Sequence, residues 1–261
     1  MTGLPVAASD VPGEKAWPTQ PYPTKPPAFS EQGVSLDDAF DLTPELKAAA
    51  QAELKKYRLG PLYTPPSVQG TVMRPGLNGG ANWGGGALDP ETGILYVKTT
   101  NTPGLARVAK VAEKTAELDA DYTLANGTLV FQGGIPLFKP PYGSLTAIDL
   151  NKGEIVWRVP FGDDARLRAN PALQGVKLPA RLGAPGTAGG IVTKGGVIFV
   201  GGGDFALHAV NTANGEDLWT YDFGRRTMAT PMTYRTASGR QIVVIANGLG
   251  RESRLTAFAL E

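Results

Sequence analysis

Alternation of apolar and polar positions predicts pairs of short β-strands through much of the chain. Residues 145–162 contain a strand, a polar turn with a glycine, and a second strand, and residues 207–224 repeat this pattern without a gap. The second strand of each copy carries a tryptophan, Trp157 or Trp219. Two strands joined by a polar turn with glycine are typical of a β-hairpin.

A further hairpin pattern precedes each repeat, at residues 87–97 and 190–200, and another follows at 230–244. Residues 255–257 begin a third copy of the strand that opens each repeat. Two hairpins make a four-stranded unit, and repeated units of this kind are typical of β-propeller blades. About two complete blades and one that lacks its last strand cannot close a ring. We therefore expect an all-β partial β-propeller, and a chain that is a fragment of a longer protein.

The predicted units give a single partial propeller domain over residues 1–261. Residues 1–78 are expected to be a connector with a helix at about 44–58, which we expect to decorate the surface. Thr43 is its predicted N-cap, and Pro44 occupies the first helical position. We place a first blade at 79–162 with an insertion at 102–141, a second blade at 186–224, and an incomplete last blade at 228–261.

Composition narrows the possible functions. The 34 glycines and 22 prolines fit a turn-rich all-β chain. The 25 basic and 24 acidic residues leave a formal charge of +1, so no nucleic-acid partner is expected. The chain has no cysteine and one histidine, which excludes thiolate chemistry and argues against histidine-based triads and metal sites. No apolar run is long enough to span a bilayer, and the first residues lack the pattern of a secretory signal.

Several motifs occur in a specific order. They are the blade motif Ala-x-Asp-x3-Gly-Glu-x2-Trp, the segment GGANWGG at 79–85, the pattern Pro-Ser-x2-Gly-Thr at 66–71, and ATPMTY at 229–234 followed by GRQIVV at 239–244. This ordered set resembles the C-terminal region of pyrroloquinoline quinone (PQQ)-dependent dehydrogenases, most closely the quinoprotein glucose dehydrogenase branch. The resemblance extends from Gly13 to Leu260.

The resemblance implies an eight-bladed propeller, of which this chain holds about three blades. Its axial cavity would bind PQQ and a calcium or magnesium ion. The whole enzyme would oxidise a sugar or alcohol in the periplasm and pass electrons to a quinone or cytochrome. The family's catalytic aspartate and metal ligands lie on earlier blades, so we expect no catalytic residue or metal ligand here. The fragment would form one wall of the cofactor site and be inactive alone.

The resemblance also suggests cofactor-binding residues. Asn82 corresponds to an asparagine that faces the quinone, often beside a tryptophan such as Trp83, because a neutral amide can hydrogen-bond PQQ without titrating. The alternative is a turn asparagine beside a core tryptophan. Asn101 ends a strand that corresponds to a strand in the family, and the family strand runs into an asparagine near the quinone. The alternative is an asparagine that simply ends the strand.

Glycine-rich positions form the second group of candidates. Gly248 and Leu249 follow the last long apolar strand, where the family has a loop whose backbone approaches the cofactor, although relatives have a histidine or tryptophan at the position of Leu249. Gly189 opens an inner strand in a similar way, and a tight strand start explains it as well. Glycine permits close approach because it has no Cβ.

Other residues are expected to be structural. Trp157 and Trp219 occupy the same position in successive repeats, and this recurrence indicates packing between blades. His208 is expected to be an outward or half-buried strand residue and not a catalytic base, and Asp163–Asp164 a solvated acidic turn. A different function, a non-catalytic propeller scaffold for protein assembly, remains open. Asn82–Trp83 and the insertion at 102–141 favour the enzyme, because a scaffold needs neither.

Overall fold

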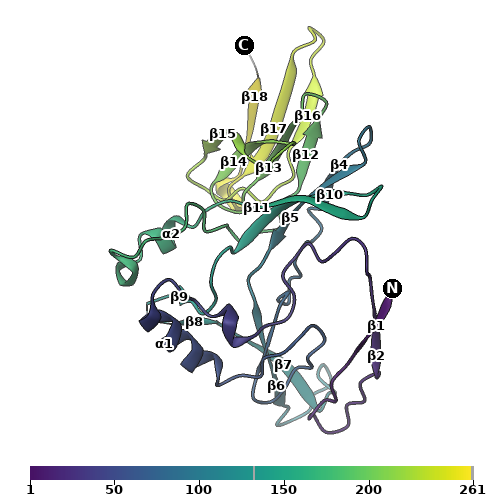
Figure 1. Ribbon diagram of the computed structural model, residues 1–261, viewed down its shortest axis with the longest axis vertical. Coiled ribbons are helices and arrows are strands. Elements are labelled where there is room, and N and C mark those ends of the chain that lie inside the picture. Colours follow the sequence, from purple (N-terminus) through teal and green to yellow (C-terminus); the bar gives the residue numbers. More distant parts are fainter. Residues whose placement is uncertain (132, 260–261) are drawn as a thin grey trace.

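Three antiparallel sheets follow one another along the chain in the computed structural model, which describes residues 1–131 and 133–259. Figure 1 places them together in the upper half of the molecule. We call them the first, second and third blades. The first contains β4 (Gly86–Asp89), β5 (Ile94–Thr100), β10 (Gly143–Asp149) and β11 (Glu154–Pro160), in the order β11-β10-β5-β4. The second contains β12 (Gly190–Thr193), β13 (Val197–Gly201), β14 (Ala206–Asn211) and β15 (Asp217–Asp222), and the third β16 (Met232–Arg235), β17 (Gln241–Asn247) and β18 (Arg254–Ala259).

The repeated hairpins have the same local chemistry. In β10–β11 the side chain of Asp149 accepts hydrogen bonds from the backbone of the turn, and Gly153 has a φ of +66°. In β14–β15 Asn211 caps its turn in the same way, and Gly215 has a φ of +76°. Both hairpins carry a bulge at the corresponding position, after Ala147 and after Ala209. The sequence repeat is therefore a repeat of backbone geometry.

Apolar packing joins each blade to the next. One cluster combines buried side chains of the first and second blades, among them Tyr96, Leu145, Ile198 and Val200. At its edge the Trp157 indole nitrogen donates to the carbonyl of Thr212 at 2.9 Å.

The second blade contacts the third in a related way. The ring centroids of Trp219 and Phe258 lie 5.2 Å apart, in an edge-to-face arrangement. Both repeated tryptophans therefore pack between blades, as their spacing predicted.

Helix α1 (Pro44–Leu54) belongs to a second core in the lower half of the molecule (Figure 1). Thr43 caps the helix by accepting a hydrogen bond from the backbone of Leu46 at 3.2 Å. Leu46, Ala50 and Leu54 are buried on one side of the helix. The expectation that this helix decorates the surface was wrong, because its i, i+4, i+8 stripe packs into the largest apolar cluster of the chain's described part.

The strands of the insertion and the connector complete this lower half. Strand β3 (Thr71–Met73) from the connector pairs with β6 (Gly104–Lys110), and β6 pairs with β7 (Tyr122–Gly127). The remaining elements are β1 (Thr2–Pro5), β2 (Thr19–Tyr22), η1 (Leu36–Asp38), β8 (Val130–Phe131), β9 (Ile135–Pro136), α2 (Ala165–Arg168), η2 (Pro171–Leu173) and η3 (Gly250–Glu252). No helix among the described residues is long and apolar enough to cross a membrane.

Candidate functional site

Three loops that lead into the first strands of the blades meet at one point. We call residues 78–85, 184–189 and 224–231 the first, second and third leading loops; they precede β4, β12 and β16. A Cβ on Gly189 would lie 1.9 Å from the carbonyl oxygen of Gly84 and 2.4 Å from Oγ1 of Thr230. A Cβ on Gly84 would lie 1.9 Å from the carbonyl oxygen of Thr187. Only glycine fits at these two positions, and their contact fixes the loops against one another.

Asn82 and Trp83 lie on the first leading loop, next to this contact. The Asn82 amide nitrogen donates to the carbonyl of Asn78 at 2.8 Å, and its amide oxygen accepts from the backbone of Trp83 at 2.8 Å. The amide therefore holds the loop and keeps one N–H and one lone pair for another partner. The Trp83 side chain is not a core residue, since 91% of the residue is exposed. An indole presented in this way offers a flat apolar surface to a ligand.

Asn101 lies behind the first leading loop. It is 6% exposed, and its amide nitrogen donates to the carbonyl of Pro141 at 3.1 Å and to the hydroxyl of Ser144 at 3.0 Å. Its amide oxygen is buried and has no hydrogen-bond partner in the described structure. The neighbouring backbone N–H of Thr100 donates to the carbonyl of Gly80 at 2.8 Å. Asn101 is thus bonded to the segment that leads into β10, and the contact with the first leading loop is made by its neighbour Thr100.

Gly248 and Leu249 follow β17 and are connected to the third leading loop. The backbone N–H of Gly248 donates to the carbonyl of Arg226 at 2.9 Å, and Gly248 has a φ of +85°. Leu249 is 69% exposed. The structure therefore brings Gly189 directly against the loop of Asn82 and Trp83, whereas Gly248 reaches this loop only through residues 226–230.

A buried lysine was missed by the sequence analysis. Lys98 lies in β5 and is 3% exposed. Its Nζ donates to the carbonyl oxygens of Ala184 at 2.8 Å and Gly186 at 2.9 Å, both in the second leading loop. Burial lowers the pKa of Lys98 to about 7, although the charge of Asp204 opposes this change. A lysine within the apolar strand ILYVKTT was the available signal.

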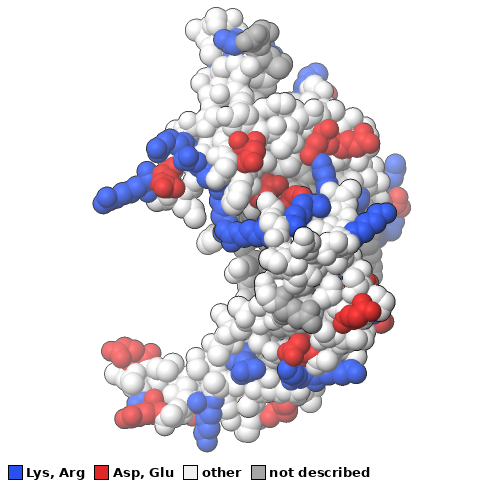
Figure 2. All heavy atoms as spheres, turned by 90° about the vertical axis from the view of Figure 1, so that its left-hand side faces the viewer, with Lys and Arg blue, Asp and Glu red and all other residues white. Residues whose placement is uncertain are grey.

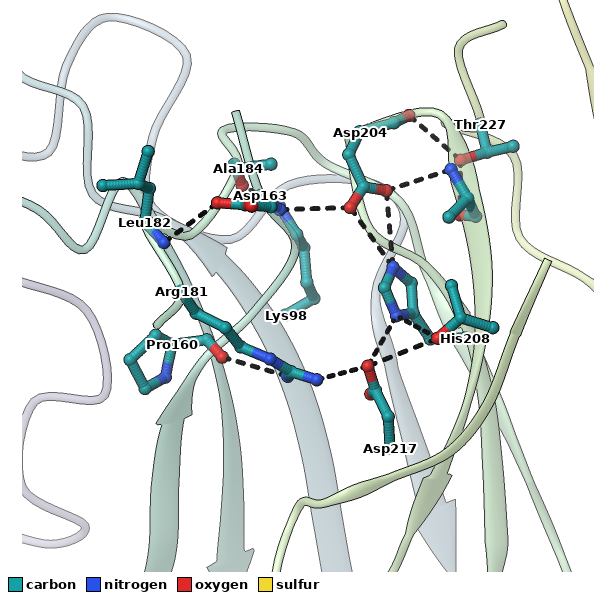
Figure 3. Close-up of polar contacts among 12 residues, drawn as sticks. Lys98, Pro160, Asp163, Arg181, Leu182, Ala184, Asp204, His208, Asp217 and Thr227 are labelled. Atoms are coloured by element: carbon teal, nitrogen blue, oxygen red, sulfur yellow. Dashed lines mark hydrogen bonds and ion pairs between the residues drawn. The ribbon is translucent and has the colours of Figure 1, made fainter. Parts of the chain in front are cut away.

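His208 is also buried, at 5% exposure, so the expectation of an outward or half-buried side chain was wrong. Its Nδ1 lies 3.1 Å from a carboxylate oxygen of Asp217, and its Nε2 lies 3.3 Å from one of Asp204 (Figure 3). Burial disfavours the charged imidazole, but hydrogen bonds and charges from Asp204 and Asp217 raise the pKa of His208 to about 9. The bulge in β14 shifts the register with β15 beside Asp217, which a strict strand alternation does not anticipate.

The two carboxylates around His208 also connect the blades. Asp204 accepts from the backbone N–H of Asp163 at 3.1 Å, and Arg181 forms an ion pair with Asp217. Burial acts to raise the pKa of both carboxyl groups, but the hydrogen bonds from His208 outweigh it and lower both values. Figure 3 shows the group spanning the loops after the first blade and the strands of the second. It is a charge network between blades, with the buried His208 at its centre and partly buried partners around it.

Asp163 and Asp164 do more than form a solvated turn. Asp163 accepts a hydrogen bond from the backbone of Leu182 at 3.1 Å, and Asp164 caps α2 by accepting from the backbone of Arg166 and Leu167. The expected acidic turn is therefore a structural junction.

A cavity of about 480 Å³ adjoins this network, lined among others by Asp163, Arg181, Asp204, His208 and Arg226. Basic and acidic side chains alternate over this side of the molecule in Figure 2, without a large patch of one sign. Across residues 1–131 and 133–259, no group of three or more histidine, cysteine or acidic side chains is placed to hold a metal ion. Charges of both signs are therefore interspersed on this side of the molecule.

Comparison with known proteins identifies relatives over nearly the whole chain. The family model of the PQQ-type glucose/ethanol/alcohol dehydrogenase β-propeller domain matches residues 1–243. A quinate/shikimate dehydrogenase (quinone) of Acinetobacter baylyi is 29% identical, over 98% of this chain and 35% of the relative. A quinoprotein glucose dehydrogenase of Escherichia coli is 29% identical, over 94% of this chain and 32% of the relative. The chain spans about a third of the length of these relatives.

Among solved structures, the quinohemoprotein alcohol dehydrogenase of Comamonas testosteroni matches with a TM-score of 0.48 and 23% identity, over 69% of this chain and 24% of that chain. The family match covers the three blades as far as residue 243 and extends through the connector and the insertion. It confirms both the resemblance inferred from the motifs and the partial β-propeller. The chain belongs to the PQQ-type glucose/ethanol/alcohol dehydrogenase β-propeller family.

Proposed function

We propose that this chain forms one wall of the PQQ site in a dehydrogenase that oxidises a sugar or alcohol. The observation that carries the proposal is the arrangement of the first leading loop. Trp83 is 91% exposed there, beside a partly free Asn82 amide, at a point where glycines fix three loops. Relatives named for quinate, glucose and glycerol oxidation support a polyol, sugar or alcohol as the substrate class.

The residues at this point fit the chemistry of PQQ. The cofactor is a flat fused-ring quinone with carboxylate groups, so it needs an aromatic or apolar surface and neutral or positive hydrogen-bond donors. Trp83 offers the flat surface, and Asn82 retains an N–H donor. Gly84 and Gly189 lack Cβ atoms, which lets the first and second leading loops pack directly against each other next to Trp83 in the sequence.

Bound PQQ would supply the two-electron acceptor for oxidation of the substrate hydroxyl group. The indole of Trp83 would stack on the ring and exclude water from one side, and the Asn82 amide would fix the orientation of a polar group of the cofactor. The carbonyl of Asn78 and the backbone of Trp83 hold that amide in place. Asn101 would act indirectly, by holding the end of β5 against Pro141 and Ser144, because the adjacent Thr100 donates to Gly80 of the loop.

The remaining parts of the enzyme belong, in this proposal, to residues outside this chain. These parts are the general base that removes the hydroxyl proton, the ligands of a calcium or magnesium ion, and the other blades. We infer that the chain alone is inactive, that the acceptor is a quinone or cytochrome, and that the enzyme works in the periplasm. The names of the quinone-linked and cytochrome-linked relatives support these two classes of acceptor.

The test is the substitution Trp83→Ala in the full-length gene product. We expect the affinity for PQQ to fall by about tenfold or more, because an aromatic contact is lost, and the melting temperature without PQQ to stay unchanged, because the residue is 91% exposed. Trp17→Ala is the control, since Trp17 is also exposed, at 74%, and lies in the N-terminal segment. Equal PQQ affinity in the wild type and the Trp83→Ala protein would contradict the proposal.

The inactivity of the isolated chain has its own test. The purified 261-residue chain is mixed with PQQ, calcium and a redox dye, and glucose or ethanol is added. We expect no substrate-dependent reduction of the dye. Reduction of the dye would show that the base and metal ligands lie within this chain.

A further inference from the structure

Lys98 occupies a position where a side chain with an amine is costly. It lies opposite Leu145 of β10, which is 1% exposed, and two positions after Tyr96, which is 5% exposed and belongs to the apolar cluster between the first and second blades. Lys98 itself is 3% exposed. A buried amine needs hydrogen-bond partners there, because apolar neighbours such as Leu145 cannot replace the hydrogen bonds that water would make.

Its partners are both backbone carbonyls of the second leading loop. Nζ donates to Ala184 at 2.8 Å and to Gly186 at 2.9 Å. A neutral amine has two N–H donors and an ammonium has three, so either form can make both hydrogen bonds. Asp204 is the acidic residue whose charge favours the ammonium form.

The segment that Lys98 holds contains no helix or strand. Residues 184–189 connect the region after η2 to β12. At one end the backbone N–H of Ala184 donates to the carbonyl of Phe161 at 2.8 Å. At the other end Gly189 and Thr187 lie against Gly84, in the contact that brings the leading loops together. The hydrogen bond from Lys98 to Gly186 fixes the middle of the segment.

We propose that Lys98 is a positioning residue of the PQQ site: its amine holds the second leading loop so that Gly189 and Thr187 meet the loop that carries Asn82 and Trp83. The part of this inference that concerns PQQ rests on the function proposed above. Lys98 acts through the backbone and does not touch the cofactor. Without the amine, the buried carbonyl of Ala184 and the partly buried carbonyl of Gly186 lose their donor, and the segment moves to find water.

The experiment compares Lys98→Met and Lys98→Ala with the wild type in the full-length gene product. Hydrogen–deuterium exchange of the backbone in residues 184–190 reports the loop, and titration with PQQ reports the site. We expect exchange in this segment to be at least about tenfold faster in both variants, and PQQ affinity to fall about tenfold. Lys194→Met, at a lysine side chain 87% exposed in the β12–β13 turn, is the control and should change neither measurement.

Chemical rescue separates positioning from general loss of structure. Lys98→Ala leaves a space that matches propylamine, which can enter and donate to the same carbonyls. We expect propylamine to restore slow exchange in residues 184–190 and PQQ affinity, and 1-propanol of similar size to restore neither. A Lys98→Ala protein that both additives restore equally, or that neither restores, would overturn the assignment.

The two proposals fail in different ways. Wild-type protein that binds no PQQ would refute the proposed function, while the exchange rates of residues 184–190 still decide the role of Lys98. Wild-type protein that binds PQQ, with a Lys98→Met variant of equal affinity and equal exchange, would refute the role of Lys98 alone.

Discussion

Replacing His208 tests whether the buried network between the blades is held by a positive charge. In His208→Asn the side chain keeps an amide group with two N–H donors but has no charge, so Asp204 and Asp217 lose their shared cationic partner. Arg181 remains paired with Asp217, whereas the donors left to Asp204 among the described residues are the backbone N–H groups of Asp163 and Ala206. The variant should therefore be less stable wherever the wild-type imidazole is protonated.

The pKa of His208 sets the size and pH range of this effect. It rises from 6.5 to about 9 on folding, which corresponds to roughly 3 kcal/mol of stabilisation. Below pH 6.5 the imidazole is protonated in both the folded and the unfolded protein, and the full contribution is present. Between 6.5 and about 9 the unfolded chain releases its proton first, so the contribution falls as pH rises, and above about 9 it is lost.

Urea unfolding followed by tryptophan fluorescence measures the difference between wild type and variant. We expect the wild type to be more stable by roughly 3 kcal/mol near pH 6, and by less than about 1 kcal/mol near pH 9.5. Lys98 has the opposite effect on the pH dependence of stability. Its pKa is lowered to about 7 in the folded protein, so its contribution to stability increases as pH rises. Both proteins contain Lys98, so this trend cancels in the difference.

Leu207→Ala is the matched control, since Leu207 precedes His208 in β14 and is fully buried. Its loss should cost about 2–5 kcal/mol at both pH values, because no titrating group is removed. A difference between wild type and His208→Asn that is the same near pH 6 and near pH 9.5 would refute the reasoning. It would mean that folding does not change the pKa of His208.

Two further substitutions test the packing that builds the site. Gly189→Ala should lower both the melting temperature and PQQ affinity, because the new Cβ would lie 1.9 Å from the carbonyl oxygen of Gly84. Gly195→Ala is the control and should leave both unchanged, because the nearest atom to its Cβ would be 4.0 Å away. Equal melting temperatures and PQQ affinities in the two variants would contradict the close contact at Gly189. Trp157→Ala should destabilise the protein by about 2–3 kcal/mol in urea unfolding through lost packing between blades. The neighbouring Val156→Ala, at a residue 55% exposed, should lower the free energy of unfolding by less than about 0.5 kcal/mol. Similar losses of stability in the Trp157→Ala and Val156→Ala proteins would argue against packing of the tryptophan between blades.

Local patterns determined the elements that depend on neighbouring residues. The strand–turn–strand repeats gave the hairpins of the first two blades, because turn residues such as Asp149 and Gly153 act within a few positions of the chain. Thr43 and Pro44 marked the start of α1 for the same reason. The burial of α1 was not evident, because the strands that cover it come from an insertion far along the chain.

The candidate site was predictable only in part. The segment GGANWGG pointed to Asn82 and Trp83, but no pattern showed that Gly189 would contact the same loop. Lys98 was missed as a buried group because its partners lie in a remote segment, and His208 because the neighbouring blade and loops cover it. Ala184 and Gly186 lie 86 and 88 positions from Lys98, and the contact of His208 with Asp217 depends on a bulge.

The sequence by itself determined that the chain consists of repeated tryptophan-bearing hairpins, since turns, caps and strand alternation are encoded over a few residues. Only the tertiary structure decided which leading loops meet, which polar groups are removed from water, and therefore which pKa values change. These properties depend on the distance between segments remote in the chain and on the water excluded between them, and neither quantity is present in a local pattern of residues.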